Sequence, residues 1–117
     1  DGIRDVERSR GLGDVYKRQI WGTAKILKAL AHPTRLFIVD ELSRQKRCVC
    51  ELAEMVGTDG STVSRHLALL KNAGIVRDEK RGAQVFYFLR VPCVLNFFSC
   101  VESVLESVAK EQLDLAQ

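Results

Sequence analysis

Two short helical patterns separated by a tight turn place the strongest constraint on how this chain can fold. Within residues 50–56 the apolar side chains recur with helical spacing, and Gly57 supplies a stop signal at the C-terminal end. Residues 58–60 have the composition of a turn, and a second helix is predicted over residues 61–72, with Ser61 as its N-cap. Two short helices joined in this way form a helix-turn-helix.

Two further helices are predicted before this motif. Residues 20–30 follow the helical i, i+4, i+7 pattern, and His32 with Pro33 ends that helix and begins the next, because proline is well tolerated in a first helical turn. We interpret His32 as a structural residue of this junction and not as a ligand. The helix over residues 33–43 is expected to bury four apolar side chains: Leu36, Phe37, Val39 and Leu42.

A hairpin and a long helix are predicted after the motif. Residues 75–79 and 84–89 are strand-like and flank a basic, glycine-containing tip at residues 80–83, which predicts a β-hairpin. The final helix, residues 94–113, is amphipathic, and such a helix on a small domain needs a partner surface for its apolar stripe.

The chain of 117 residues is long enough for one domain, which we assign to residues 20–117. Residues 1–19 are charged, carry glycines in no period and resemble translated adapter sequence, so we expect a non-native or disordered leader, or an idle helix. No apolar run approaches the roughly 18 residues of a membrane span, and no secretory signal is recognised. These features predict a cytoplasmic protein.

The predicted order of elements is that of a mostly α fold with a small β-hairpin wing, the winged helix-turn-helix. In this fold the second helix of the motif, the recognition helix, enters the major groove and phosphate contacts flank it. Residues 61–90 carry six cations against two carboxylates, which suits an anion-facing surface. The candidate DNA-binding residues lie on the outer face of this helix or near the hairpin tip: Ser61, Thr62, Ser64, Arg65, His66, Lys71, Lys80, Arg81 and Gln84. A winged helix that contacts only proteins is an alternative.

The four cysteines, Cys48, Cys50, Cys93 and Cys100, suggest metal binding or thiol chemistry in a reducing compartment. In a continuous helix Cys48 and Cys50 would point about 200° apart. They converge only if the entry to the helix is non-helical, as the β-prone residues 47–49 permit. A thiol enzyme is rejected, because no general base is predicted near these cysteines.

Four segments, in this order, resemble the ArsR/SmtB family of dimeric winged-helix repressors: residues 29–36 (ALAHPTRL), 48–52 (CVCEL), 61–67 (STVSRHL) and 70–76 (LKNAGIV). The resemblance covers about residues 20–109. It implies a homodimer joined through the first and last helices, bound to double-stranded operator DNA as an inverted repeat and released by an inducer. No cofactor would be required for DNA binding.

Cys48-Val49-Cys50 resembles the family's thiolate motif for As(III) and Sb(III) or, in other members, Cd(II), Pb(II) or Zn(II); Cu(I) is a further alternative for soft thiolates. The third cysteine of the arsenical motif is Ala53 here, and the last helix lacks the histidine of the family's zinc site. We therefore expect Cys93, which follows the second wing strand, to complete the site, with Cys100 as an alternate or fourth ligand.

A competing hypothesis keeps the fold and changes the signal. Other relatives sense persulfides or oxidants through a dithiol, and a Cys50–Cys93 or Cys50–Cys100 disulfide would serve that role here. Release of DNA by As(III) under strong reductant would favour the metal, and release only by persulfide or peroxide would favour the redox signal.

Overall fold

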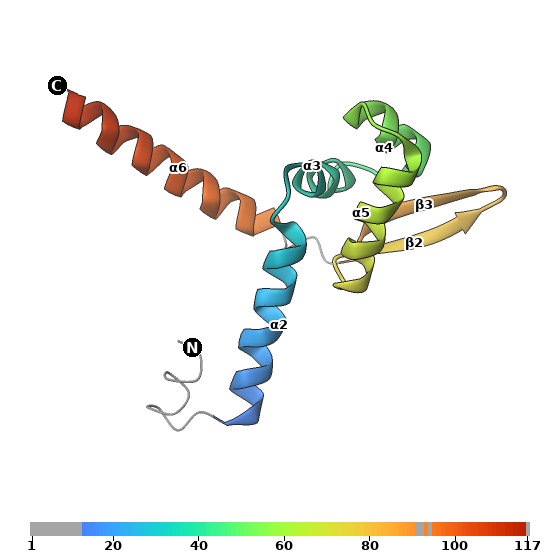
Figure 1. Ribbon diagram of the computed structural model, residues 1–117, viewed down its shortest axis with the longest axis horizontal. Coiled ribbons are helices and arrows are strands. Elements are labelled where there is room, and N and C mark those ends of the chain that lie inside the picture. The colour runs from blue at the N-terminus through green and yellow to red at the C-terminus, as the bar shows by residue number, and fades with distance from the viewer. Residues whose placement is uncertain (1–12, 91–92, 94, 117) are drawn as a thin grey trace.

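The computed structural model describes residues 13–90, 93 and 95–116 and has the predicted order of elements. Helices α3 to α5 and the hairpin form a body, from which α2 and α6 extend in different directions (Figure 1). The elements are α2 (Asp14–Leu30), α3 (Pro33–Leu42), β1 (Arg47–Cys48), α4 (Val49–Val56), α5 (Gly60–Asn72), β2 (Val76–Arg81), β3 (Gln84–Leu89) and α6 (Leu95–Ala116).

The core lies where α3, α4 and α5 meet the base of the hairpin. The predicted stripe of α5, Val63, Leu67 and Leu70, has no exposed surface and packs with residues from every neighbouring element. The other buried apolar residues are Leu30, Ile38, Val39, Leu42, Leu52, Ala53, Ile75 and Val76. Their burial holds the helix-turn-helix in one arrangement.

The two helices of the motif are delimited by local signals. Gly57 ends α4 with a left-handed backbone, φ +82°, which glycine adopts without steric cost. The N-cap of α5 is Asp59 and not Ser61, so that prediction was wrong: the Asp59 carboxylate accepts a hydrogen bond from the Thr62 N–H at 2.9 Å. Thr62 lowers the pKa of Asp59, through its side chain first and this N–H second, and a carboxylate also suits the positive end of the helix dipole.

His32 has the structural role expected of it. Its Nδ1 accepts a hydrogen bond from the Thr34 N–H at 3.1 Å and so caps α3, which begins at Pro33. The prediction that Leu36 and Phe37 are buried was wrong, because these side chains remain 37% and 39% exposed. They line an open groove of about 380 Å³ that α6 borders on its other side.

The sheet is antiparallel with the strand order β1-β3-β2. We call the hairpin of β2 and β3 the wing. Its turn is tighter than predicted, because only Gly82, with φ +62°, and Ala83 lie outside the strands. In β1, Cys48 is opposite Phe86. The short strand before the motif therefore pairs with the returning strand of the wing.

Helices α2 and α6 leave wide apolar faces exposed. Helix α2 begins at Asp14, so residues 14–19, which we assigned to the leader, are helical, whereas residues 1–12 lie outside the described part of the chain. Trp21 on α2 is 51% exposed and Leu105 on α6 is 63% exposed. Within the described ranges, no helix combines the length and the hydropathy required to cross a membrane.

A candidate thiol site beside a candidate nucleic-acid interface

Cys48 and Cys50 bring their sulfur atoms together at the start of the helix-turn-helix. Cys48 ends β1 and has an extended backbone (φ −88°, ψ 167°), whereas Cys50 lies in the first turn of α4. This change of backbone places the two Sγ atoms 2.9 Å apart. We call Cys48 and Cys50 the thiol pair.

Ion pairs hold the entry to α4 in place. The Glu51 carboxylate accepts a hydrogen bond from the Cys48 N–H at 3.1 Å, and this bond is the main reason that the pKa of Glu51 is lowered. Arg47 donates to Glu51 at 3.0 Å and to Glu41 on α3 at 3.1 Å. Arg47 thus joins the thiol pair to the body of the domain, and its pKa is raised chiefly by Glu51.

The two thiols differ in their access to solvent. Cys48 is buried and Cys50 is exposed. The hydrogen bond with Cys50 and, secondly, burial raise the pKa of the Cys48 thiol. A soft ion must displace the Cys48 proton, because the thiolate is the ligand. Cys50 is the thiol that an incoming ligand meets first.

The thiol pair opens toward the wing. A shallow cleft of about 260 Å³ is lined by Cys48, Val49, Cys50, Gln84 and Val85, so its far wall is the beginning of β3. The pairing of β1 with β3 places this cleft, because it sets Cys48 opposite the residue that follows Val85.

Lys46, the residue before β1, contacts both strands of the wing. Lys46 pairs with Glu79 of β2 at 3.0 Å, lies 4.8 Å from the ring centroid of Phe88, and lowers the pKa of Glu79. These contacts hold the start of β1, the strand that contains Cys48, against both strands of the wing.

Cys93 and Cys100 lie apart from the thiol pair. Cys93 follows β3, and that strand leads away from Cys48 at about 3.3 Å per residue beyond Phe86. Cys100 lies on α6, and both side chains are exposed. Among the residues that the structure describes, no three His, Cys, Asp or Glu side chains gather as a metal site. The structure therefore brings together two of the four predicted ligands.

Helix α5 presents short hydroxyl groups and one arginine on its outer face. Ser61, Ser64 and Arg65 are exposed, and Thr62 is half-buried with its N–H bound to Asp59. These residues lie away from the buried stripe of the helix, as a groove-reading surface requires.

His66 faces the protein more than the groove. It is half-buried, its ring centroid is 4.6 Å from that of His32, and its buried Nδ1 has no hydrogen-bond partner among the described residues. Burial and, secondly, His32 lower the pKa of His66, with Arg35 and Arg65 adding to the effect. Its geometry fits a contact between α5 and the α3 junction better than the predicted DNA contact.

Lowering the pH is expected to destabilise the fold through His66. Its folded pKa is below the usual 6.5, so the unfolded chain binds the proton more readily. The stability is complete above the unfolded pKa and is lost as the pH falls through the folded value. Urea unfolding between about pH 7.5 and about pH 5 measures this loss. In His66→Gln the pH dependence should be shallower, and equal slopes for the two proteins would contradict the prediction.

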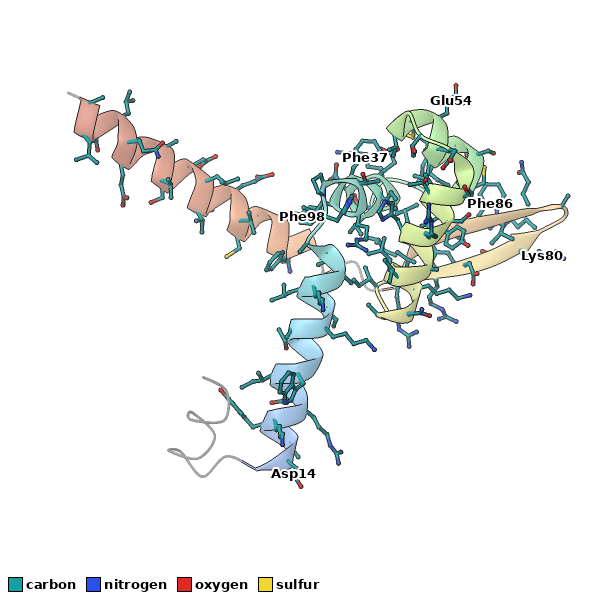
Figure 2. All side chains as sticks on the ribbon, in the orientation of Figure 1. Asp14, Phe37, Glu54, Lys80, Phe86 and Phe98 are labelled. Carbon is teal, nitrogen blue, oxygen red and sulfur yellow. The ribbon has the colours of Figure 1, made fainter. Side chains whose placement is uncertain are left out.

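The remaining predicted DNA-binding side chains, on α5 and on the wing, differ in whether a described carboxylate pairs with them. Lys71 bridges α5 and β2 through Asp78 at 2.8 Å, which raises the pKa of Lys71. Arg81 pairs with Glu79 at 3.3 Å. Lys80 and Gln84 are exposed, and Lys80 lies toward the tip of the wing (Figure 2). Lys80 is thus the predicted wing cation best placed for phosphate.

Sequence reasoning missed four residues that shape the thiol site: Lys46, Arg47, Glu51 and Val85. The signal for Glu51 was available, because a glutamate three residues after an N-cap residue forms a capping box. No signal was available for Val85, because its place beside the thiol pair depends on how β1 pairs with β3.

A helix-turn-helix with an exposed polar recognition face, followed by a hairpin wing, defines a winged-helix DNA-binding protein. Residues 32–78 match the family described as "Bacterial regulatory protein, arsR family". The chain is 38% identical over 88 residues to the "Cadmium resistance transcriptional regulatory protein CadC homolog" of Staphylococcus aureus. These 88 residues are 74% of this chain and 73% of that protein. The chain belongs to the ArsR family of transcriptional repressors, which are DNA-binding regulators and not enzymes.

Two further relatives support this assignment. The "HTH-type transcriptional repressor SmtB" of Mycobacterium tuberculosis is 43% identical over 65 residues, 56% of this chain and 48% of that protein, so the match spans about half of its length. The homodimeric winged helix-turn-helix DNA-binding domain of Mb0332 from Mycobacterium bovis has a TM-score of 0.75 and 29% identity. That comparison covers 86% of this chain and 94% of the other.

Proposed function

We propose that this repressor binds operator DNA as a homodimer and releases it when As(III) or Sb(III) binds the thiol pair. The observation that carries the proposal is the 2.9 Å separation of the Cys48 and Cys50 sulfurs at the first residues of the helix-turn-helix. The cadmium-resistance relative supports a metal signal, the SmtB relative supports a repressor, and the homodimeric Mb0332 domain supports a dimer.

The sulfur separation favours some ions over others. Sulfurs 2.9 Å apart, with thiolate bonds of about 2.3 Å, subtend an angle of about 80° at a shared ion. A linear Cu(I) site would require about 4.6 Å between the sulfurs, and a tetrahedral Zn(II) or Cd(II) site about 3.8 Å, at the same bond length. A pyramidal ion therefore requires the smallest rearrangement of the pair.

Release follows from the position of the pair. Cys48 is both the last residue of β1 and the N-cap residue of α4. A shared ion that draws its sulfur closer therefore displaces both elements. An ion that binds better to a distorted α4 entry shifts the population away from the form that grips DNA.

An inorganic ion needs a third thiolate, for which Cys93 remains our first choice and Cys100 the second. Either must approach through a rearrangement, because both are exposed and apart from the pair. Cys93→Ser is expected to abolish operator release by As(III) while leaving DNA binding within about twofold, since the residue lies outside the core. Fluorescence anisotropy of a labelled operator measures both quantities, and unchanged release would remove Cys93 from the site.

The proposed function is tested by titrating the reduced protein with As(III), Cd(II), Zn(II) and Cu(I) in turn. Thiolate-to-metal absorption counts the sulfurs, and anisotropy of an operator fragment selected from random DNA reports release. As(III) should act at the lowest concentration. DNA affinity that does not fall with salt would instead favour a winged helix used for protein contacts.

The same 2.9 Å approach supports a second candidate function, thiol redox sensing. The exposed Cys50 would react first with an oxidant or persulfide. The thiol of Cys48, which lies beside it, would then close the disulfide. Operator release by As(III) in excess phosphine reductant contradicts this alternative, and release by peroxide or persulfide alone supports it.

A further inference from the structure

The thiol pair offers two sulfurs and an apolar wall, and this combination points to a particular class of ligand. All four cysteines lie within the described residues, and only Cys48 and Cys50 approach each other. The cleft beside them is lined by Val49 and Val85, with the Gln84 side chain as the polar contributor of the wing. Half-buried valines on both sides suit a hydrocarbon group better than a hydrated ion.

We propose that the inducer of this repressor is a monosubstituted trivalent arsenical, R–As(III), whose organic group occupies the cleft between α4 and the wing. The inference rests on the proposed function and names its ligand class. Arsenic of this kind already has one As–C bond, so two thiolates complete its pyramid. The thiol pair then forms the whole site, and neither Cys93 nor Cys100 is required.

The binding reaction is a ligand exchange. In R–As(OH)₂ the two As–O bonds break, and As–S bonds form to Cys48 and Cys50. Each thiol proton leaves with one hydroxide as water, so two waters are released and arsenic stays trivalent. The reaction needs no oxidant.

The organic group would act on the wing. Gln84 and Val85 begin β3, and Val85 precedes the residue that pairs with Cys48, so a group held at the sulfurs presses on the strand that returns from the wing tip. Lys46 and its partners Glu79 and Phe88 bind β1 to the same hairpin. A larger R group is therefore expected to move the wing further than a methyl group does.

The test compares phenylarsine oxide with inorganic arsenite in phosphine reductant, on the full chain and on the double variant Cys93→Ser/Cys100→Ser. Both replaced cysteines are exposed, so the double variant should fold. Intact mass counts the arsenic per chain, and titration of free thiols counts the sulfurs consumed. Phenylarsine should bind one per chain with two thiols consumed in both proteins, whereas the double variant should bind arsenite at least 10-fold more weakly.

Two further variants complete the design. Cys50→Ser should lose phenylarsine binding, because one thiolate cannot close the site. Val85→Thr keeps the size and branching of the side chain and replaces one methyl by a hydroxyl, so it should weaken phenylarsine several-fold and arsenite less. Equal weakening of both ligands would place the phenyl group elsewhere and overturn the cleft assignment.

The two hypotheses fail differently. If arsenite binds the full chain but phenylarsine does not bind the double variant, the further inference is overturned and the proposed function stands. If neither arsenical binds the full chain, both are overturned together.

Discussion

Replacement of Arg65 by alanine should weaken operator binding by about 1–3 kcal/mol, a factor of about 5 to 150. Arg65 is exposed on the outer face of α5. The other lysine or arginine of this helix is Lys71, which is paired with Asp78. Arginine combines full charge with a planar set of donors, which suits guanine or phosphate. Anisotropy titrations over a range of salt concentrations measure the loss.

The salt series also identifies the contact. A lost phosphate contact lowers the slope of log affinity against log salt by about one, and weakens all sequences alike. A lost base contact weakens the selected operator more than random DNA. Arg44→Ala is the matched control, because this exposed arginine lies in the turn after α3 and pairs with Asp40. If Arg65→Ala and Arg44→Ala bind equally well, α5 is not the recognition helix.

Replacement of Leu67 by alanine should reduce the free energy of unfolding by about 2–5 kcal/mol. Leu67 has no exposed surface and lies at the centre of the buried stripe of α5. The substitution removes apolar contacts within the buried cluster that α5 shares with α3, α4 and the start of β2, and it leaves a cavity that the packed core fills only in part. A loss of this size is a large part of the stability of a small domain.

Leu69→Ala is the control for this prediction, because Leu69 lies on the same helix and is 50% exposed. It removes the same atoms in the same helical context and should cost less than about 1 kcal/mol. Urea unfolding of both variants must be compared at one protein concentration, since formation of the proposed dimer would contribute to apparent stability. Similar losses in the two variants would contradict the packing of α5 described above.

Local signals in the sequence were sufficient for much of the fold. The stripe of Val63, Leu67 and Leu70, the stop at Gly57 and the junction at His32 each depend on neighbours a few residues away, and each prediction was confirmed. The approach of Cys48 and Cys50 was also foreseeable, because the geometry of a continuous helix excludes it and a β-prone entry permits it.

Features that depend on distant parts of the chain could not be foreseen. Leu36 and Phe37 are apolar, but their exposure depends on how far α6 lies from α3. The cleft beside the thiol pair depends on the register that sets Cys48 opposite Phe86, and a shift of the strands would present other side chains there. The same register directs Cys93 away, although the sequence alone suggested proximity.

Cys48 has several structural roles, and these limit how a sensor of this kind can change the inducer that it binds. This residue pairs in the sheet, caps α4, is buried and offers a sulfur, so a replacement that removes the sulfur also changes the cap and the packing. Cys50 and Gln84 are exposed and Val85 is half-buried, so these three residues have fewer structural roles. Selection for a new inducer in a mutant library should therefore accumulate changes at those three positions and leave Cys48 untouched.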